Sequence, residues 1–113
     1  MAESVSLAVL ENLVHMQRED FPVGYVVIGA LLPSTIEILS ADQLRSAVGD
    51  LRPQALGDRW LESVASAVLQ VPSAVVPSES NYLLNPRHPD FTKIVTELPL
   101  PFLFDDRLFT RRA

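Results

Sequence analysis

Prolines in the last third of this 113-residue chain limit its folding more than any other feature. A proline fixes φ and has no backbone N–H, so it interrupts helices and the interior of sheets. Six of the nine prolines fall between residues 72 and 101, which predicts short strands and rigid loops there rather than long helices. The expected strands cover residues 69–71, 74–76, 82–84 and 102–104.

The beginning of the chain instead shows helical periodicity. Residues 4–17 predict a helix with a wide apolar arc, which is typical of a helix covered on most sides. Glu11 lies opposite the centre of that arc, one turn from Leu7 and one turn from His15. The Phe-Pro pair at residues 21–22 is expected to end the element. The arc consists of a central stripe, Val5, Val9, Leu13 and Met16, flanked by Leu7, Leu10 and Val14.

The middle of the chain predicts strands and short helices. Residues 23–32 form a nearly continuous apolar run, which suits a buried central strand, and residues 36–39 predict a second, shorter strand. Ser40, with Gln43 three residues later, predicts a capping box that opens a helix. That helix is expected to stop near Gly49.

A further helix is expected to open at Gly57 and Asp58. Its apolar face would consist of Trp60, Leu61, Val64, Ala65 and Val68. Together these elements predict an α+β fold, with a small mixed or antiparallel sheet and flanking helices. The length allows one domain over residues 1–113.

Composition excludes several classes of function. A net charge of −5 repels phosphate backbones, so direct binding to nucleic acid is not expected. The chain has no cysteine, which excludes disulfides, iron–sulfur clusters, thiol catalysis and cysteine zinc sites. The two histidines, His15 and His88, lack the spacing of metal ligands, so no metal site is expected. The longest apolar run, residues 23–32, is too short to span a bilayer, and a cytoplasmic protein is expected.

Two stretches are candidates for chemistry. Prolines in residues 71–91 fix the backbone around polar side chains, and rigid loops of this kind often carry binding groups. The structural alternative is that Asn and Pro simply build turns there. Glu11 has apolar neighbours and is a candidate for a partly desolvated carboxylate, unless it lies at a solvent edge near Arg18. The polar side chains of the loop are Ser73, Ser78, Ser80, Asn81, Asn85 and His88.

Familiar catalytic motifs are absent from the sequence. No serine lies in a G-x-S-x-G elbow, and no glycine pattern matches a P-loop or a dinucleotide fingerprint. Three stretches nevertheless resemble one family, the RES domain of bacterial toxin–antitoxin pairs. They are AESVSLAVLENLVH (2–15), VPSAVVPSESNYLLNPRHPDF (71–91) and FLFDDRLF (102–109). The segment GDRWL (57–61) falls where that family has a comparable segment.

The resemblance implies a function and a site. RES toxins degrade NAD by phosphorolysis or hydrolysis until a cognate antitoxin blocks them, and their fold is similar to that of ADP-ribosyltransferase toxins. Glu11 matches the family glutamate and Ser73 the family serine, so these are the expected catalytic residues. Asn81 and Asn85 are expected to shape the NAD pocket. NAD is then the substrate, inorganic phosphate a candidate co-substrate, and the antitoxin a partner in a hetero-oligomer.

Charge suggests how these residues would act. Breaking the bond between nicotinamide and ribose builds positive charge on the sugar, which a preorganised carboxylate stabilises. Glu11 is the expected carboxylate, and Ser73 is expected to hydrogen-bond the nicotinamide side or the ribose.

The sequence also departs from the family pattern. The family arginine and an associated tyrosine belong to a segment that comes before this first helix, so an N-terminally truncated pattern is expected. Two explanations are expected for this pattern: Met1 is an internal methionine of a longer protein, or the gene is truncated. The functional alternatives are an active toxin, an inactive remnant that binds a partner, and an unrelated small binding module. The arginines present do not match the motif: Arg18, Arg45, Arg52, Arg59, Arg87, Arg107, Arg111 and Arg112.

Overall fold

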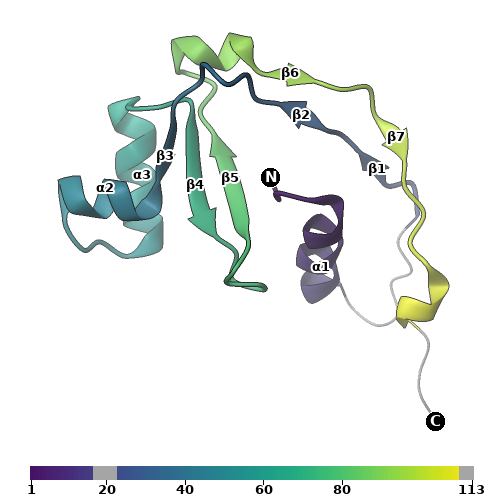
Figure 1. Ribbon diagram of the computed structural model, residues 1–113. Coiled ribbons are helices and arrows are strands. Elements are labelled where there is room, and N and C mark those ends of the chain that lie inside the picture. The colour runs from purple at the N-terminus through teal and green to yellow at the C-terminus, as the bar shows by residue number, and fades with distance from the viewer. Residues whose placement is uncertain (17–22, 110–113) are drawn as a thin grey trace.

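The computed structural model describes residues 1–16 and 23–109, without the side chain of Phe109. Three strands form the main sheet in the order β3 (Ile38–Ser40), β4 (Val68–Pro72) and β5 (Ser80–Leu84). β3 runs parallel to β4, and β5 runs antiparallel to it. Helices α2 (Ala41–Val48) and α3 (Pro53–Ser63) lie on one side of this sheet, as Figure 1 shows. The predicted α+β class with a mixed sheet and flanking helices is confirmed.

Helix α1 (Val5–His15) lies on the other side of β5, between the main sheet and an extended arm (Figure 1). Ser4 caps its first turn, because the Ser4 hydroxyl accepts a hydrogen bond from the Leu7 N–H at 3.1 Å. Leu7 is fully buried, whereas Val5 is about half exposed. The prediction that α1 is covered on most sides is therefore wrong: the helix is buried on the face that carries Leu7.

The arm consists of two short antiparallel pairs. β1 (Val26–Val27) pairs with β7 (Leu100–Pro101), and β2 (Ala30–Leu31) pairs with β6 (Val95–Thr96). A pocket lined by residues of α1 and the arm shows that the two pack together. The arm side of that pocket includes Tyr25, Phe102 and Phe104, whose rings form edge-to-face contacts at 5.0 and 5.3 Å.

The prediction of a buried central strand over residues 23–32 is wrong. The run forms the two short strands β1 and β2, and Val26 and Leu31 are 54% and 58% exposed. Gly24 has φ +74°, a conformation that extended strands do not contain. The partner segment contains Pro99 and Pro101, which cannot donate ladder hydrogen bonds.

Two other predicted strands are also absent. Residues 74–76 form bends, because the Ser73 hydroxyl accepts from the N–H groups of Val75 and Val76 and takes them out of any ladder. Residues 102–104 follow β7 without strand pairing of their own. The predicted strands at 69–71 and 82–84 are confirmed within β4 and β5.

The helix predictions were right at one element and displaced at another. The capping box is confirmed, with Gln43 N–H donating to Ser40 Oγ at 3.1 Å, and α2 ends at Gly49. α3 begins at Pro53 rather than at Gly57, because proline is well suited to the first helical position. Val64 ends α3, Leu61 is 41% exposed, and Val68 belongs to β4, so the predicted apolar face is wrong in its outer members.

Trp60 is the centre of the core between α2, α3 and the sheet. Its side chain is 2% exposed, and its indole N–H donates to the Ser66 hydroxyl at 2.8 Å. That hydroxyl in turn donates to the Val68 carbonyl at 2.7 Å, which ties the core to β4. The buried cluster consists of Ala41, Leu44, Leu56, Trp60 and Leu69.

Val64 is strained, and its replacement should stabilise the chain. It adopts φ +53° and ψ +33°, a left-handed conformation that costs a β-branched residue about 1–3 kcal/mol. We expect Val64→Gly to raise the free energy of unfolding by about 1 kcal/mol in urea denaturation. Ala65→Gly is the control and should lower it by up to about 1 kcal/mol. A Val64→Gly chain no more stable than the wild type would contradict the assignment of strain.

Candidate functional site

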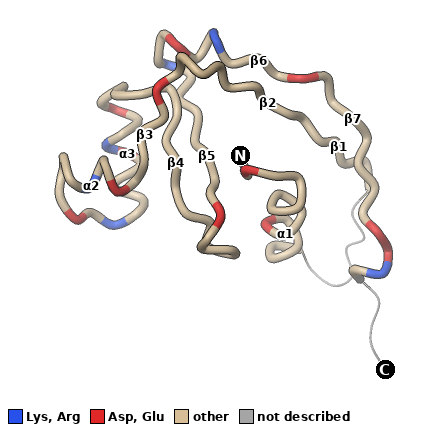
Figure 2. The backbone as a smooth tube through the Cα atoms, in the orientation of Figure 1, with Lys and Arg blue, Asp and Glu red and all other residues tan. Residues whose placement is uncertain are grey.

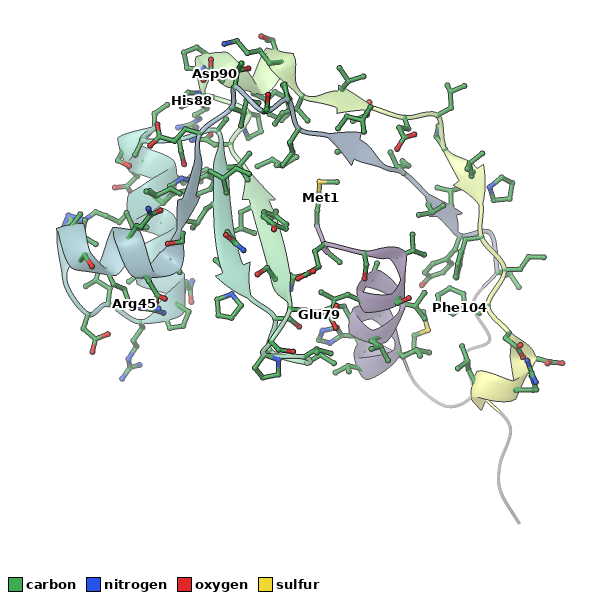
Figure 3. All side chains as sticks on the ribbon, in the orientation of Figure 1. Met1, Arg45, Glu79, His88, Asp90 and Phe104 are labelled. Carbon is green, nitrogen blue, oxygen red and sulfur yellow. The ribbon has the colours of Figure 1, made fainter. Side chains whose placement is uncertain are left out.

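The first residues of the chain fix helix α1 against the edge of β5. Ala2 forms an antiparallel bridge with Asn81, and the Tyr82 N–H donates to the Met1 carbonyl at 2.6 Å. The Met1 ammonium group donates to the Tyr82 carbonyl at 2.8 Å, and the Glu3 N–H donates to the Ser80 carbonyl at 3.1 Å. Figure 3 shows Met1 between the main sheet and the arm. This pairing determines which face of α1 points to the sheet.

Glu11 points from that face to β5 and to the loop between β4 and β5. The Ser73 hydroxyl donates to Glu11 Oε1 at 2.6 Å. The Asn81 side-chain amide donates to the same oxygen at 2.9 Å. The three side chains are 62 and 70 residues apart in the sequence, and the fold brings them into direct contact.

Ser73 is held rigidly at the end of β4. Its side chain and backbone are 2% exposed, and its N–H donates to the Glu79 carbonyl at 2.8 Å. Its hydroxyl accepts from the N–H groups of Val75 and Val76 at 3.1 and 3.0 Å. Pro72 ends the strand directly before it. The loop thus presents one buried hydroxyl to the carboxylate of α1.

These contacts keep Glu11 ionised. Its pKa lies below the ordinary value, first because the Ser73 hydroxyl donates to the carboxylate and then because the Asn81 amide does so. Partial burial opposes the shift, while positive charge on His15 and on the amino terminus adds to it. Because the folded-state pKa is lower, this carboxylate stabilises the fold above the unfolded-state pKa. The contribution is lost as the pH falls through the lowered folded-state pKa.

Asn85 lies elsewhere and is not brought to Glu11. It is fully buried just beyond β5, where its side-chain amide donates to the Leu61 carbonyl at 3.4 Å. Its side-chain oxygen accepts from the Arg87 N–H at 3.0 Å. Both bonds stabilise the turn after β5 and its contact with α3, so the structure gives Asn85 a place in the scaffold rather than beside the carboxylate.

The other polar residues of the loop also form local hydrogen bonds. Ser80 accepts from the Gln70 side chain at 3.0 Å, and the His88 ring accepts from the Asp90 N–H at 3.0 Å. His88 thereby caps the short 3-10 helix Pro89–Lys93 (Figure 3). Ser78 is exposed. The turn-building alternative holds for His88, whereas Ser73 combines a turn with a contact to Glu11.

Among the described residues, Lys and Arg lie on other elements than the one that carries Glu11. Figure 2 shows Lys and Arg over α2, α3, the turn before β6 and the short helix Asp106–Phe109, whereas α1 and the segment that leads into β5 carry acidic residues. Arg18, the neighbour considered for Glu11, lies outside the described residues, as does the 21–22 pair expected to end α1.

Within residues 1–16 and 23–109, no group of three or more His, Cys, Asp or Glu side chains is placed to hold a metal ion. In the same residues, no helix has the length and apolar character needed to cross a membrane.

The chain is similar to known proteins over a range that includes Glu11, Ser73 and Asn81. Residues 1–105 match the sequence profile of the RES domain. A protein named Toxin Res from Yersinia enterocolitica is 40% identical in an alignment of 117 residues, gaps included, and the alignment covers 96% of this chain and 75% of the relative. Toxin Res of Photorhabdus laumondii is 39% identical over 114 residues, covering 96% and 73%. A protein named Prs ADP-ribosylating toxin from Sphingobium sp. is 32% identical over 120 residues, covering 97% and 73%.

Proposed function

Because this chain belongs to the RES domain family, we propose that it is a toxin that cleaves NAD at the bond between nicotinamide and ribose. The observation that carries the proposal is the contact of Glu11 with Ser73 and Asn81, which holds a carboxylate ionised at the junction of α1 and the sheet. Relatives named as toxins, including one named as ADP-ribosylating, support the same assignment.

The chemistry requires negative charge beside the sugar. The bond from the ribose carbon to the nicotinamide nitrogen breaks, and neutral nicotinamide leaves with the electron pair. The ribose then carries oxocarbenium character until an acceptor oxygen bonds to the same carbon and loses its proton. An ionised carboxylate fixed before the reaction begins stabilises this transition state more than the ground state. Glu11 supplies that carboxylate in our proposal.

The acceptor decides which kind of enzyme this is. Water gives ADP-ribose, and inorganic phosphate gives a phosphorylated ADP-ribose. A protein side chain would give ADP-ribosylation, the activity in the name of the Sphingobium relative. We propose a small-molecule acceptor, water or phosphate, and expect no metal or other cofactor to take part.

Incubation of the purified protein with NAD tests this function. We expect free nicotinamide to accumulate, measured by chromatography, and phosphate to raise the rate if phosphorolysis operates. Product analysis by mass spectrometry distinguishes ADP-ribose from its phosphorylated form. A folded chain that releases no nicotinamide, with or without phosphate, would exclude the proposed reaction for this chain.

One observation favours a second candidate, a module that binds a partner without cleaving NAD. The pyrophosphate of NAD is negatively charged, and arginine is a natural partner for it. Within the described residues, neither α1 nor β5 carries a Lys or Arg (Figure 2). The nicotinamide assay separates the two candidates, because a binding module leaves NAD intact.

A cognate antitoxin is the partner we propose for either candidate. It would cover the Glu11 site and form a hetero-oligomer with this chain. The many half-exposed apolar side chains of α1 and the arm, among them Val14, Ile28 and Leu100, support a covered surface.

A further inference from the structure

The two carboxylate oxygens of Glu11 have different surroundings. Oε1 accepts hydrogen bonds from both Ser73 and Asn81. Among the residues that the structure describes, no donor reaches Oε2. Two donors on one oxygen restrict the rotation of the carboxylate and favour one direction of Oε2 relative to β5.

The Ser73 hydroxyl has no capacity left for a substrate. A hydroxyl has one donor hydrogen and two acceptor lone pairs. The hydrogen goes to Glu11, and the lone pairs accept from Val75 and Val76. The residue is also buried at 2% exposure. Contact with a bound molecule would require one of these three bonds to break.

The backbone of Asn81 is paired on both sides. It pairs with Val71 of β4 on one side and forms the bridge with Ala2 on the other. Its backbone therefore has two neighbours, and its side chain emerges from a paired strand rather than from a loop. The amide nitrogen that reaches Glu11 is thus placed by strand register.

We propose that Ser73 and Asn81 are positioning residues, which hold Glu11 Oε1 so that Oε2 alone acts on the reacting sugar. This positioning role rests on the proposed function, because it concerns the cleavage of NAD. The role also differs from the expectation that Ser73 hydrogen-bonds the nicotinamide side or the ribose. In this assignment Ser73 contributes through the orientation and ionisation of Glu11.

The groups around Glu11 determine how its pKa should change when Ser73 or Asn81 is removed. His15 and the Met1 ammonium group bring positive charge, and both lower the Glu11 pKa. The acidic residues nearest in the hydrogen-bond network are Glu79, whose backbone carbonyl accepts from the Ser73 N–H, and Glu3, whose carboxylate accepts from the Ser80 N–H; neither contributes to the shift of the Glu11 pKa. Removing one donor leaves these charges in place, so the pKa of Glu11 must rise by the contribution of that hydrogen bond.

The test compares Ser73→Ala and Asn81→Ala with two matched variants. Ser73→Thr keeps the hydroxyl, and Ser78→Ala changes an exposed serine of the same loop. The kcat for nicotinamide release should fall about 10- to 100-fold in the two alanine variants with a nearly unchanged KM for NAD. The acid limb of the pH–rate profile should move to higher pH in both, because Glu11 then protonates more easily. Ser73→Thr should return the acid limb of the pH–rate profile to its wild-type position. Ser78→Ala should leave kcat, KM and the pH–rate profile unchanged.

A large rise in KM for Ser73→Ala, with the acid limb unmoved, would overturn the proposal, because it would place Ser73 on the substrate.

A second measurement does not depend on turnover: carbon-13 NMR of labelled glutamate carboxyls gives the Glu11 titration in the free chain. Its pKa should rise in Ser73→Ala and in Asn81→Ala, and an unchanged value in both would overturn the positioning role. If the wild type cleaves no NAD, the proposed function fails while this titration still decides the positioning. Should Ser73→Ala not fold, Asn81→Ala, at a half-buried position, gives the decision.

Discussion

Glu11→Gln should reduce nicotinamide release from NAD by about 10³-fold, the scale of removing one preorganised electrostatic group from an active site. Glutamine has the same shape, and its side-chain oxygen can accept from Ser73 and Asn81 as Oε1 does. The amide nitrogen would then occupy the place of Oε2. It would turn N–H groups, rather than negative charge, toward a sugar that becomes positive. The fold should survive, and the chemistry should not.

A steady-state assay of nicotinamide release, together with circular dichroism of the same samples, makes this measurement. Glu62→Gln is the matched control, because it removes the same charge from an exposed position on α3. We expect that control to retain wild-type activity. Unchanged NAD consumption by a folded Glu11→Gln chain would remove Glu11 from the mechanism.

Trp60→Ala should produce the largest loss of stability, about 3–5 kcal/mol of the free energy of unfolding. The indole is nearly fully buried, and it ends the hydrogen-bond chain through Ser66 to Val68. Its removal leaves a cavity at the contact of α3 with the sheet and takes away a partner of the Ser66 hydroxyl. Small domains have only about 5–15 kcal/mol in total, so this one substitution should remove a large share of the stability of the chain.

Urea denaturation followed by circular dichroism gives the loss directly. Leu61→Ala is the control, since the next residue of the same helix is 41% exposed and should change stability by about 1 kcal/mol or less. A Trp60→Ala chain within about 1 kcal/mol of the wild type would show that the core does not depend on this side chain.

Local signals in the sequence predicted some elements well. Ser40 and Gln43 predicted the capping box because both hydrogen bonds form within one helical turn. Gly49 marked the end of α2 because its φ of +96° is one that glycine adopts without strain. The strands at 69–71 and 82–84 were also predicted from local signals, because prolines mark the limits of these short extended segments.

Burial was predicted less well because it depends on what covers a segment. Residues 23–32 have the composition of a central strand, yet within the described part of the chain their strand partners are confined to the proline-broken segment that forms β6 and β7. α1 has a wide apolar arc, but the pairing of the first residues with β5 turns the Leu7 and Glu11 side inward. Neither partner can be read from the periodicity of the segment itself.

The sequence by itself determined that Glu11 and Ser73 were the residues to follow, and that prolines would hold the loop around Ser73. Only the tertiary structure decided that they meet, that Asn81 joins them on the same carboxylate oxygen, and that Asn85 does not. The physical reason is range. Capping and proline effects act over a few residues, whereas these contacts depend on the register of β5 with β4 and with the first residues of the chain.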